Sequence, residues 1–272
     1  MAFTTHNRVI QGELVHYYAS VLGEKEKSKS DTQTPLNPPF VRGEKRQTTL
    51  GPTLVNGETT KTDLVFLHGW RSYGLVWREL IENLTALGYR SFAPDLPGFG
   101  RSPAPRRDFS LSDYCAVVEE YISICGACKP ITLIGHSFGG RIGIKLGSQD
   151  NPPFEKLVLI DSAGISSHKN TAKTRAIKAV ARAFKFPFKP RLMQPLKKRL
   201  YKAIGSEDYL ATPELKTTFL NIIKEDLTPL LTHISAPTLI LWGEQDKKTP
   251  LSDARLMREQ IPHSKLITFK NA

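Results

Sequence analysis

The amino-acid sequence predicts an α/β fold, with a mostly parallel sheet covered by helices on both faces and a helical cap inserted between two strands. Three observations lead to this prediction. From residue 63 onward, short apolar β-branched runs alternate with amphipathic helical patterns, which is typical of a buried parallel sheet. Residues 165–231 interrupt the alternation with helical patterns alone. A Gly-x-Ser-x-Gly turn joins one predicted strand to the helix behind it.

The first 60 residues divide into an ordered and a polar part. Residues 1–23 alternate loosely around Gly12, which predicts an opening hairpin of two strands belonging to the core. Residues 24–60 are rich in Lys, Thr, Pro and Gly and lack a sustained period. We expect a flexible insertion there, because so little apolar surface cannot offset the entropy lost on ordering.

The predicted core continues through residues 61–164 and returns at residues 232–272. We expect strands at 64–67, 89–93, 131–134, 156–160, 238–242 and 265–269, and helices at about 80–87, 110–125, 138–147 and 251–260. Leu80, Ile81, Leu84 and Leu87 have helical spacing, and Gly88 predicts where their helix ends. Ser110 followed by Asp113 has the pattern of a capping box.

Ser137 is the candidate nucleophile. It follows the apolar run Ile131–Ile134 and precedes a glycine-punctuated helix, with Gly135 and Gly139 two residues away on either side. A side chain exposed at a sharp strand-to-helix turn needs a strained backbone and small neighbours, which these glycines supply. The free N–H groups at the start of the helix lie beside it.

Five motifs in order make the chain, from Leu64 to its end, resemble the α/β-hydrolase family, in its serine-nucleophile type with a helical cap. They are His68-Gly69, Asp95–Ser102 (DLPGFGRS), Gly135–Gly139 (GHSFG), Leu159-Ile160-Asp161 and Trp242–Asp246 (WGEQD). A weaker resemblance, through Leu67–Trp70, Val76-Trp77 and Asp95–Ser102, links it to the carboxylesterases that demethylate pimeloyl acyl-carrier-protein methyl ester.

The resemblance implies roles for individual residues. Ser137 would be the nucleophile and Asp246 the acid that orients the catalytic histidine, with the backbone N–H groups of Trp70 and Phe138 as the oxyanion hole. Asp161 also follows a strand and is an alternative acid. Three further residues are expected to be structural: His68, which would fix the oxyanion loop, Asp95 and His136. No cofactor and no metal ion are implied, and the isolated Cys125-x-x-Cys128 lacks a second ligand pair.

The catalytic histidine of the family pattern is missing. It is expected just after the last strand, but the sequence stops at Ala272, before that position and before the last helix of the fold. His263 precedes the strand and should lie at its opposite end. The resemblance therefore implies either a fragment or a protein without its general base, with catalysis impaired in proportion.

The predicted function is hydrolysis of a carboxylic ester through an acyl-enzyme, on a small-molecule ester or acyl substrate. Thioester cleavage and carbon–carbon bond hydrolysis remain alternatives, because one triad serves each reaction. The missing histidine also leaves open a non-catalytic, hydrolase-like binding protein.

The formal net charge of +12 is concentrated in the predicted cap. Between Ser162 and Ser206 there are twelve Lys or Arg and no Asp or Glu, so this segment accounts for the whole excess. Such a face is either merely solvated or binds an acidic partner, for which we consider an acyl-carrier protein, an anionic membrane surface or an acidic small substrate. Nucleic acid is not expected, because the segment lacks aromatic stacking positions and a groove-reading helix pattern. Residues 1–10 lack the apolar stretch of a signal peptide, which predicts a cytoplasmic protein.

Overall fold

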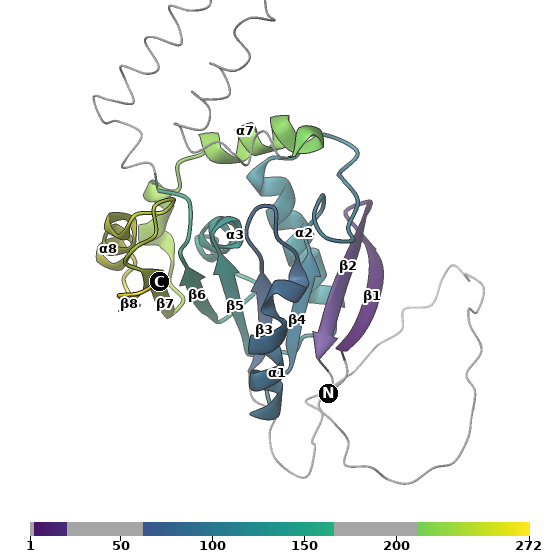
Figure 1. The fold of residues 1–272 in the computed structure, drawn as a ribbon, viewed down its shortest axis with the longest axis horizontal. Coiled ribbons are helices and arrows are strands. Elements are labelled where there is room, and N and C mark those ends of the chain that lie inside the picture. Colours follow the sequence, from purple (N-terminus) through teal and green to yellow (C-terminus); the bar gives the residue numbers. More distant parts are fainter. Residues whose placement is uncertain (1–2, 21–61, 166–211) are drawn as a thin grey trace, which may run out of the picture.

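The computed structural model describes residues 3–20, 62–165 and 212–272, which contain one eight-stranded sheet (Figure 1). The strands are β1 (Phe3–Ile10), β2 (Glu13–Ser20), β3 (Asp63–Leu67), β4 (Ser91–Asp95), β5 (Ile131–His136), β6 (Lys156–Ile160), β7 (Thr238–Gly243) and β8 (Ser264–Phe269). Their order is β1-β2-β4-β3-β5-β6-β7-β8. Pairing is antiparallel from β1 to β4 and parallel from β4 to β8, so the predicted mostly parallel sheet is confirmed.

Helices cover both faces of this sheet. The described helical elements are η1 (Gly74–Trp77), α1 (Arg78–Ala86), α2 (Leu111–Ile124), α3 (Phe138–Gly147), η3 (Pro213–Leu215), α7 (Lys216–Lys224), η4 (Thr228–His233) and α8 (Leu251–Gln260). Helices α2, α3 and α8 share the larger core with one face, and α1 covers the other. In the described ranges, no helix has both the length and the apolar character needed to cross a bilayer.

The central strand β3 shows why the sequence forms a covered sheet. Its side chains alternate, so Leu64 and Phe66 pack with Ile81 of α1, whereas Val65 and Leu67 belong to the core beneath α2 and α3. All five residues of β3 are buried. Its first residue, Asp63, is paired with Arg90, and the other four residues are apolar, as expected of a strand that is buried on both faces.

Helix α1 confirms one detail of the prediction and corrects another. Gly88 has φ +85°, and hydrogen bonds run from its N–H to Thr85 O and from the next N–H to Leu84 O, as expected of a glycine-terminated helix. However, Leu80 and Leu87 are 42% and 61% exposed and do not face the sheet. The short helix places only a narrow stripe around Ile81 and Thr85 against the strands.

The other local predictions agree with the structure. Gln11 and Gly12 both have positive φ, as a two-residue turn between antiparallel strands requires. The Ser110 hydroxyl and the Asp113 carboxylate each accept a hydrogen bond from the other's backbone N–H, which completes the capping box of α2.

Two predicted segments lie mainly outside the described residues. The insertion at 24–60 lies wholly outside them, as do all twelve basic residues of the cap. The described end of the predicted cap, from residue 212, contains η3 and α7, and α7 lies across the carboxyl ends of the strands (Figure 1).

Candidate active site

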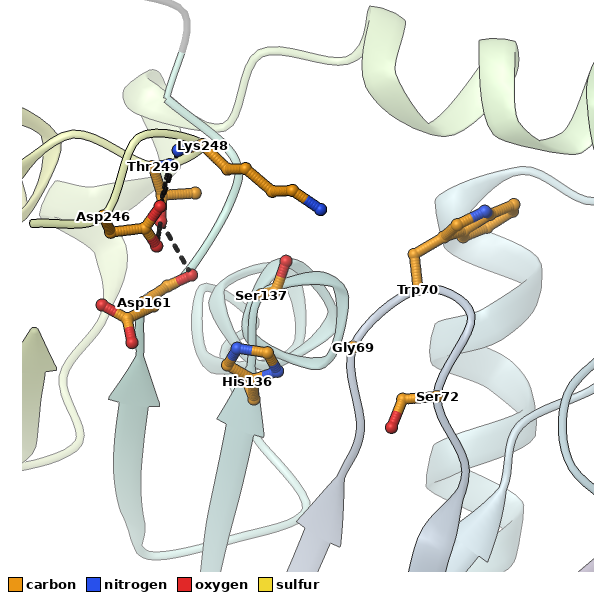
Figure 2. A pocket seen from close by; sticks show the side chains of 9 residues that line it. All are labelled: Gly69, Trp70, Ser72, His136, Ser137, Asp161, Asp246, Lys248 and Thr249. Carbon is orange, nitrogen blue, oxygen red and sulfur yellow. Dashed lines mark hydrogen bonds between the residues drawn. The ribbon is translucent and has the colours of Figure 1, made fainter. Parts of the chain in front are cut away.

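Ser137 lies at the junction of β5 and α3, in the conformation expected of an exposed nucleophile. Its φ is +49° and its ψ is −103°, which is strained for a residue with a side chain. Strain of this kind costs about 1–3 kcal/mol and persists only where the surroundings impose it. Figure 2 shows the hydroxyl pointing away from the strands into the open space above them.

The two glycines around the serine are needed because the backbone is crowded there. A Cβ atom on Gly135 would lie 2.5 Å from the carbonyl oxygen of Gly139. One on Gly139 would collide with the carbonyl oxygen of Leu67 in the neighbouring strand β3. A side chain at either position would displace the turn that presents Ser137.

Two backbone N–H groups, those of Trp70 and Phe138, are the oxyanion donors that the family resemblance implies. Phe138 is the first residue of α3, and Trp70 follows the His68-Gly69 pair after β3. Among the described residues, neither N–H has a hydrogen-bond acceptor. The Trp70 loop is a turn closed by a hydrogen bond from Ser72 N–H to Gly69 O, 3.1 Å long, with φ +63° at Arg71. Free donors of this kind can stabilise a developing oxyanion.

His68 holds this loop in place. Its ring is fully buried, and Nε2 accepts a hydrogen bond from Leu96 N–H at 3.0 Å. The proton of the neutral ring is therefore on Nδ1, which donates to Gly69 O at 2.8 Å. Burial lowers the pKa of His68 to about 4, against the ordinary value of 6.5. His68 is thus a neutral structural residue beneath the Trp70 loop, which is the candidate oxyanion loop.

The depressed pKa of His68 predicts a pH-dependent stability. Between about pH 6.5 and pH 4 the unfolded chain binds a proton that folded His68 does not, so stability is complete above this window and falls as the pH drops through it. The loss should reach about 3 kcal/mol near pH 4. Urea unfolding at a series of pH values should show a shallower decline for His68→Gln than for wild type. The exposed His263→Gln is the control with the wild-type slope, and parallel curves for wild type and His68→Gln would contradict the assignment.

Asp246 follows β7 and organises its own loop. One carboxylate oxygen accepts hydrogen bonds from the N–H groups of Lys248 (2.6 Å) and Thr249 (3.1 Å), and the other accepts from the Thr249 hydroxyl (2.6 Å). These bonds fix the direction of the carboxylate without neutralising it. The spacing Asp-x-x-Thr is a local signal for this arrangement that the sequence analysis did not use.

Asp161, the alternative acid, lies close to the same place at the end of β6. Its φ is +41°, and its carboxylate accepts a hydrogen bond from Gly243 N–H at 2.9 Å. The Thr249 hydroxyl also lies 3.3 Å from its carbonyl oxygen. The structure thus brings both candidate carboxylates to the same edge of the sheet as Ser137.

A pocket of about 140 Å³ joins these groups (Figure 2). The residues that line it are Gly69, Trp70, Ser72, His136, Ser137, Asp161, Asp246, Lys248 and Thr249. The lining therefore includes the predicted nucleophile, both carboxylates and one of the two oxyanion residues. It also includes Lys248, which the sequence analysis had not singled out, and whose side chain extends over Ser137 toward Trp70 (Figure 2).

His136 is the one histidine among the described lining residues. Its ring fills the space beside Gly69, where an added Cβ would lie 2.8 Å from Nδ1. Burial lowers its pKa, and the carboxylates of Asp161 and Asp246 partly oppose the shift. The Ser137 hydroxyl points away from the ring (Figure 2), and no hydrogen bond in the described part of the chain joins the two. The ring's position agrees with the expected packing role, although His136 also forms part of the pocket wall.

The structure also shows where the two remaining candidates, His263 and Asp95, lie. The carbonyl oxygen of His263 accepts a hydrogen bond from the N–H of Thr238, the first residue of β7, so His263 lies at the amino ends of the strands. Ser137 lies at the carboxyl ends, which excludes direct contact. Buried Asp95 accepts hydrogen bonds from the N–H groups of Gly74 and Arg101, as expected of a residue that holds the turn.

Known proteins of similar sequence include hydrolases and esterases. Residues 64–272 match the family model described as "Alpha/beta hydrolase family". The AB hydrolase superfamily protein YisY of Bacillus subtilis is 26% identical over 231 residues, covering 77% of this chain and 83% of its own. The pimeloyl-[acyl-carrier protein] methyl ester esterase of Aeromonas hydrophila is 29% identical over 228 residues, covering 77% and 87%.

Solved structures show the same fold at lower identity. A bacterial membrane phospholipase A superposes with a TM-score of 0.66 at 20% identity, covering 98% of this chain and 78% of its own. The thioesterase domain from the curacin biosynthetic pathway gives 0.62 at 18% identity, covering 100% and 93%. At these identities the likeness supports the fold alone, but the family model spans most of the chain. The chain belongs to the α/β-hydrolase family.

Proposed function

We propose that the protein is a serine hydrolase that cleaves a carboxylic ester through an acyl-enzyme. The observation that carries this proposal is the Ser137 hydroxyl, which a strained backbone presents at a pocket, beside two backbone N–H groups that have no acceptor among the described residues. A hydroxyl presented in this way can attack a carbonyl carbon while the N–H groups of Trp70 and Phe138 bind the developing oxyanion. Mutating one such donor has cost about 10²–10³ in kcat in a well-studied protease.

The proposed reaction has two halves. Ser137 Oγ forms a bond to the ester carbonyl carbon, its proton passes to a base, and the tetrahedral intermediate expels the alcohol, which receives that proton. Water then attacks the acyl-serine, and the acid product leaves with Ser137 restored. Asp246 would orient the imidazole of the base and stabilise its charged form, since its carboxylate is fixed at the pocket.

The base is a separate question from the nucleophile. We propose that His136 is not the base, because its ring lies on the opposite side of Ser137 from the hydroxyl (Figure 2). The intact mass of the protein expressed from its own gene tests for another source. A mass above 30.4 kDa would show that the natural chain contains residues in addition to residues 1–272. At 30.4 kDa, residual acylation or binding without useful turnover is the expected behaviour.

Fluorophosphonate labelling tests the nucleophile directly. An activated serine forms a covalent phosphonyl ester with this reagent, and peptide mass spectrometry should place the label on the peptide containing Ser137. An unlabelled protein that nevertheless binds acyl compounds would instead support the hydrolase-like binding protein.

The substrate we propose is an ester linked to an acidic carrier. Several relatives bear the name pimeloyl-[acyl-carrier protein] methyl ester esterase, and the cap sequence concentrates the whole excess positive charge. Electrostatic attraction between a basic surface and an acidic carrier weakens as salt shortens the Debye length from about 30 Å at 0.01 M to about 8 Å at 0.15 M.

Salt should therefore act selectively on a carrier-linked substrate. Raising the salt concentration over this range should lower kcat/KM for an acyl-carrier-protein methyl ester about tenfold or more. The value for a small neutral ester such as p-nitrophenyl acetate should change little. Equal salt responses of the two substrates would argue against an acidic carrier.

A further inference from the structure

Helix α7 is joined to the nucleophile helix α3 by two basic side chains. Arg141 Nη2 donates to the carbonyl oxygens of Ile222 (2.5 Å) and Glu225 (2.6 Å), at the end of α7. Lys145, one turn further along α3, forms an ion pair with the Glu225 carboxylate at 2.5 Å. These contacts hold the two helices together within the first two to three turns after Ser137.

Burying the Arg141 guanidinium between α3 and α7 costs free energy, which its hydrogen bonds must offset. It is only 5% exposed, and burial lowers its pKa to about 10 despite the nearby carboxylates. Arg141 is also the fourth residue of α3, close to the positive end of the helix dipole, which disfavours a cation. The carbonyl groups at the negative end of α7 compensate, because hydrogen bonds from an ionised donor are stronger than neutral ones.

One turn before Ile222, the Phe219 side chain of α7 reaches the oxyanion loop. The ring of Phe219 lies 5.1 Å from the indole of Trp70, centroid to centroid. The same indole contacts Phe99 at 4.8 Å and Phe138 at 5.3 Å, both in edge-to-face geometry. Phe99 and Phe138 belong to the core, whereas Phe219 comes from α7. One of the rings that hold Trp70 in place therefore depends on the position of α7.

We propose that Arg141 and Phe219 are positioning residues for the oxyanion hole: Arg141 holds α7 against α3, and Phe219 transmits that position to Trp70. The proposal rests on the function proposed above, since Trp70 N–H is one of the two oxyanion donors. Helix α7 of the cap would then contribute to catalysis by positioning Trp70, in addition to any contact with substrate. Two charged ties and one ring contact link the cap, the nucleophile helix and the oxyanion loop.

Small-ester kinetics test the coupling, because acetate is too short to depend on a distant wall of the pocket. For p-nitrophenyl acetate, Phe219→Ala should lower kcat about tenfold with KM within about twofold, since a misplaced donor weakens the transition state and not ground-state binding. Arg141→Met should act in the same direction, and Arg141→Lys should recover part of the loss. Leu220→Ala, at an exposed neighbouring position of α7, is the matched control and should match wild type.

Hydrogen exchange gives a readout that does not require turnover. The Ser72 amide closes the oxyanion turn through its bond to Gly69 O, so it reports the order of that loop. Its exchange should accelerate at least threefold in Phe219→Ala and Arg141→Met but not in Leu220→Ala. If Arg141→Met does not fold, Phe219→Ala alone still decides the question. An unchanged Ser72 rate, or a raised KM with unchanged kcat, would overturn the coupling, whereas failure of fluorophosphonate labelling in wild type would overturn only the proposed reaction.

Discussion

Replacing Ser137 by alanine is expected to abolish fluorophosphonate labelling and, in a form of the protein that contains a catalytic histidine, to lower kcat for ester hydrolysis on the order of a million-fold. The oxyanion donors and the pocket would remain, so a slow reaction above the rate in water should persist. Since Ser137 has strained φ and ψ angles that alanine must also adopt, the variant should fold with similar stability. Mass spectrometry of the labelled peptide and a p-nitrophenyl ester assay measure the two effects.

A second hydroxyl in the pocket gives the matched comparison. Ser72 also lines the pocket but lies on the oxyanion loop in an ordinary turn, without the elbow geometry of Ser137. Ser72→Ala should therefore retain the covalent label. Persistence of the label in Ser137→Ala, or its loss in Ser72→Ala alone, would show that the nucleophile has been assigned to the wrong residue.

In a form of the protein that contains a catalytic histidine, Asp246→Asn is expected to lower kcat about 10⁴-fold, the loss seen when the acid of a serine triad is replaced by its amide. The change should leave the loop intact. An asparagine oxygen can still accept from the N–H groups of Lys248 and Thr249, and its amide can donate to the Thr249 hydroxyl. The variant thus removes the negative charge while preserving the geometry, and circular dichroism and urea unfolding would verify that.

Asp161→Asn separates the two candidate acids. It is the same chemical change in the same pocket, and asparagine tolerates the positive φ of position 161. We expect less than a tenfold loss in kcat, because the Asp161 carboxylate accepts a hydrogen bond from Gly243 N–H, at the start of the loop that carries Asp246. An asparagine oxygen can accept the same bond. A larger loss of kcat for Asp161→Asn than for Asp246→Asn would show that Asp161, and not Asp246, is the acid.

The local structure was predictable where the pattern of residues has one physical solution. Short apolar runs identified the parallel strands, of which β3 and β4 are buried at every position. Gly88 and Ser110 marked helix ends because their backbone requirements are strict. The prediction was wrong for Leu80 and Leu87, which lie at helical spacing but are exposed. Spacing predicts which residues lie on the same face of a helix. Whether each of them is buried depends on how much of that face contacts the sheet.

The sequence by itself determined the family, the sheet and the candidate residues Ser137 and Asp246, because each depends on a short motif with a strict local geometry. Only the tertiary structure decided that Asp161 and Asp246 share one pocket, that His136 forms part of its wall, and that Arg141 ties α3 to α7. These relations join residues far apart in the chain. They depend on strand order and on the packing of helices over the carboxyl ends of the strands, neither of which a local pattern specifies.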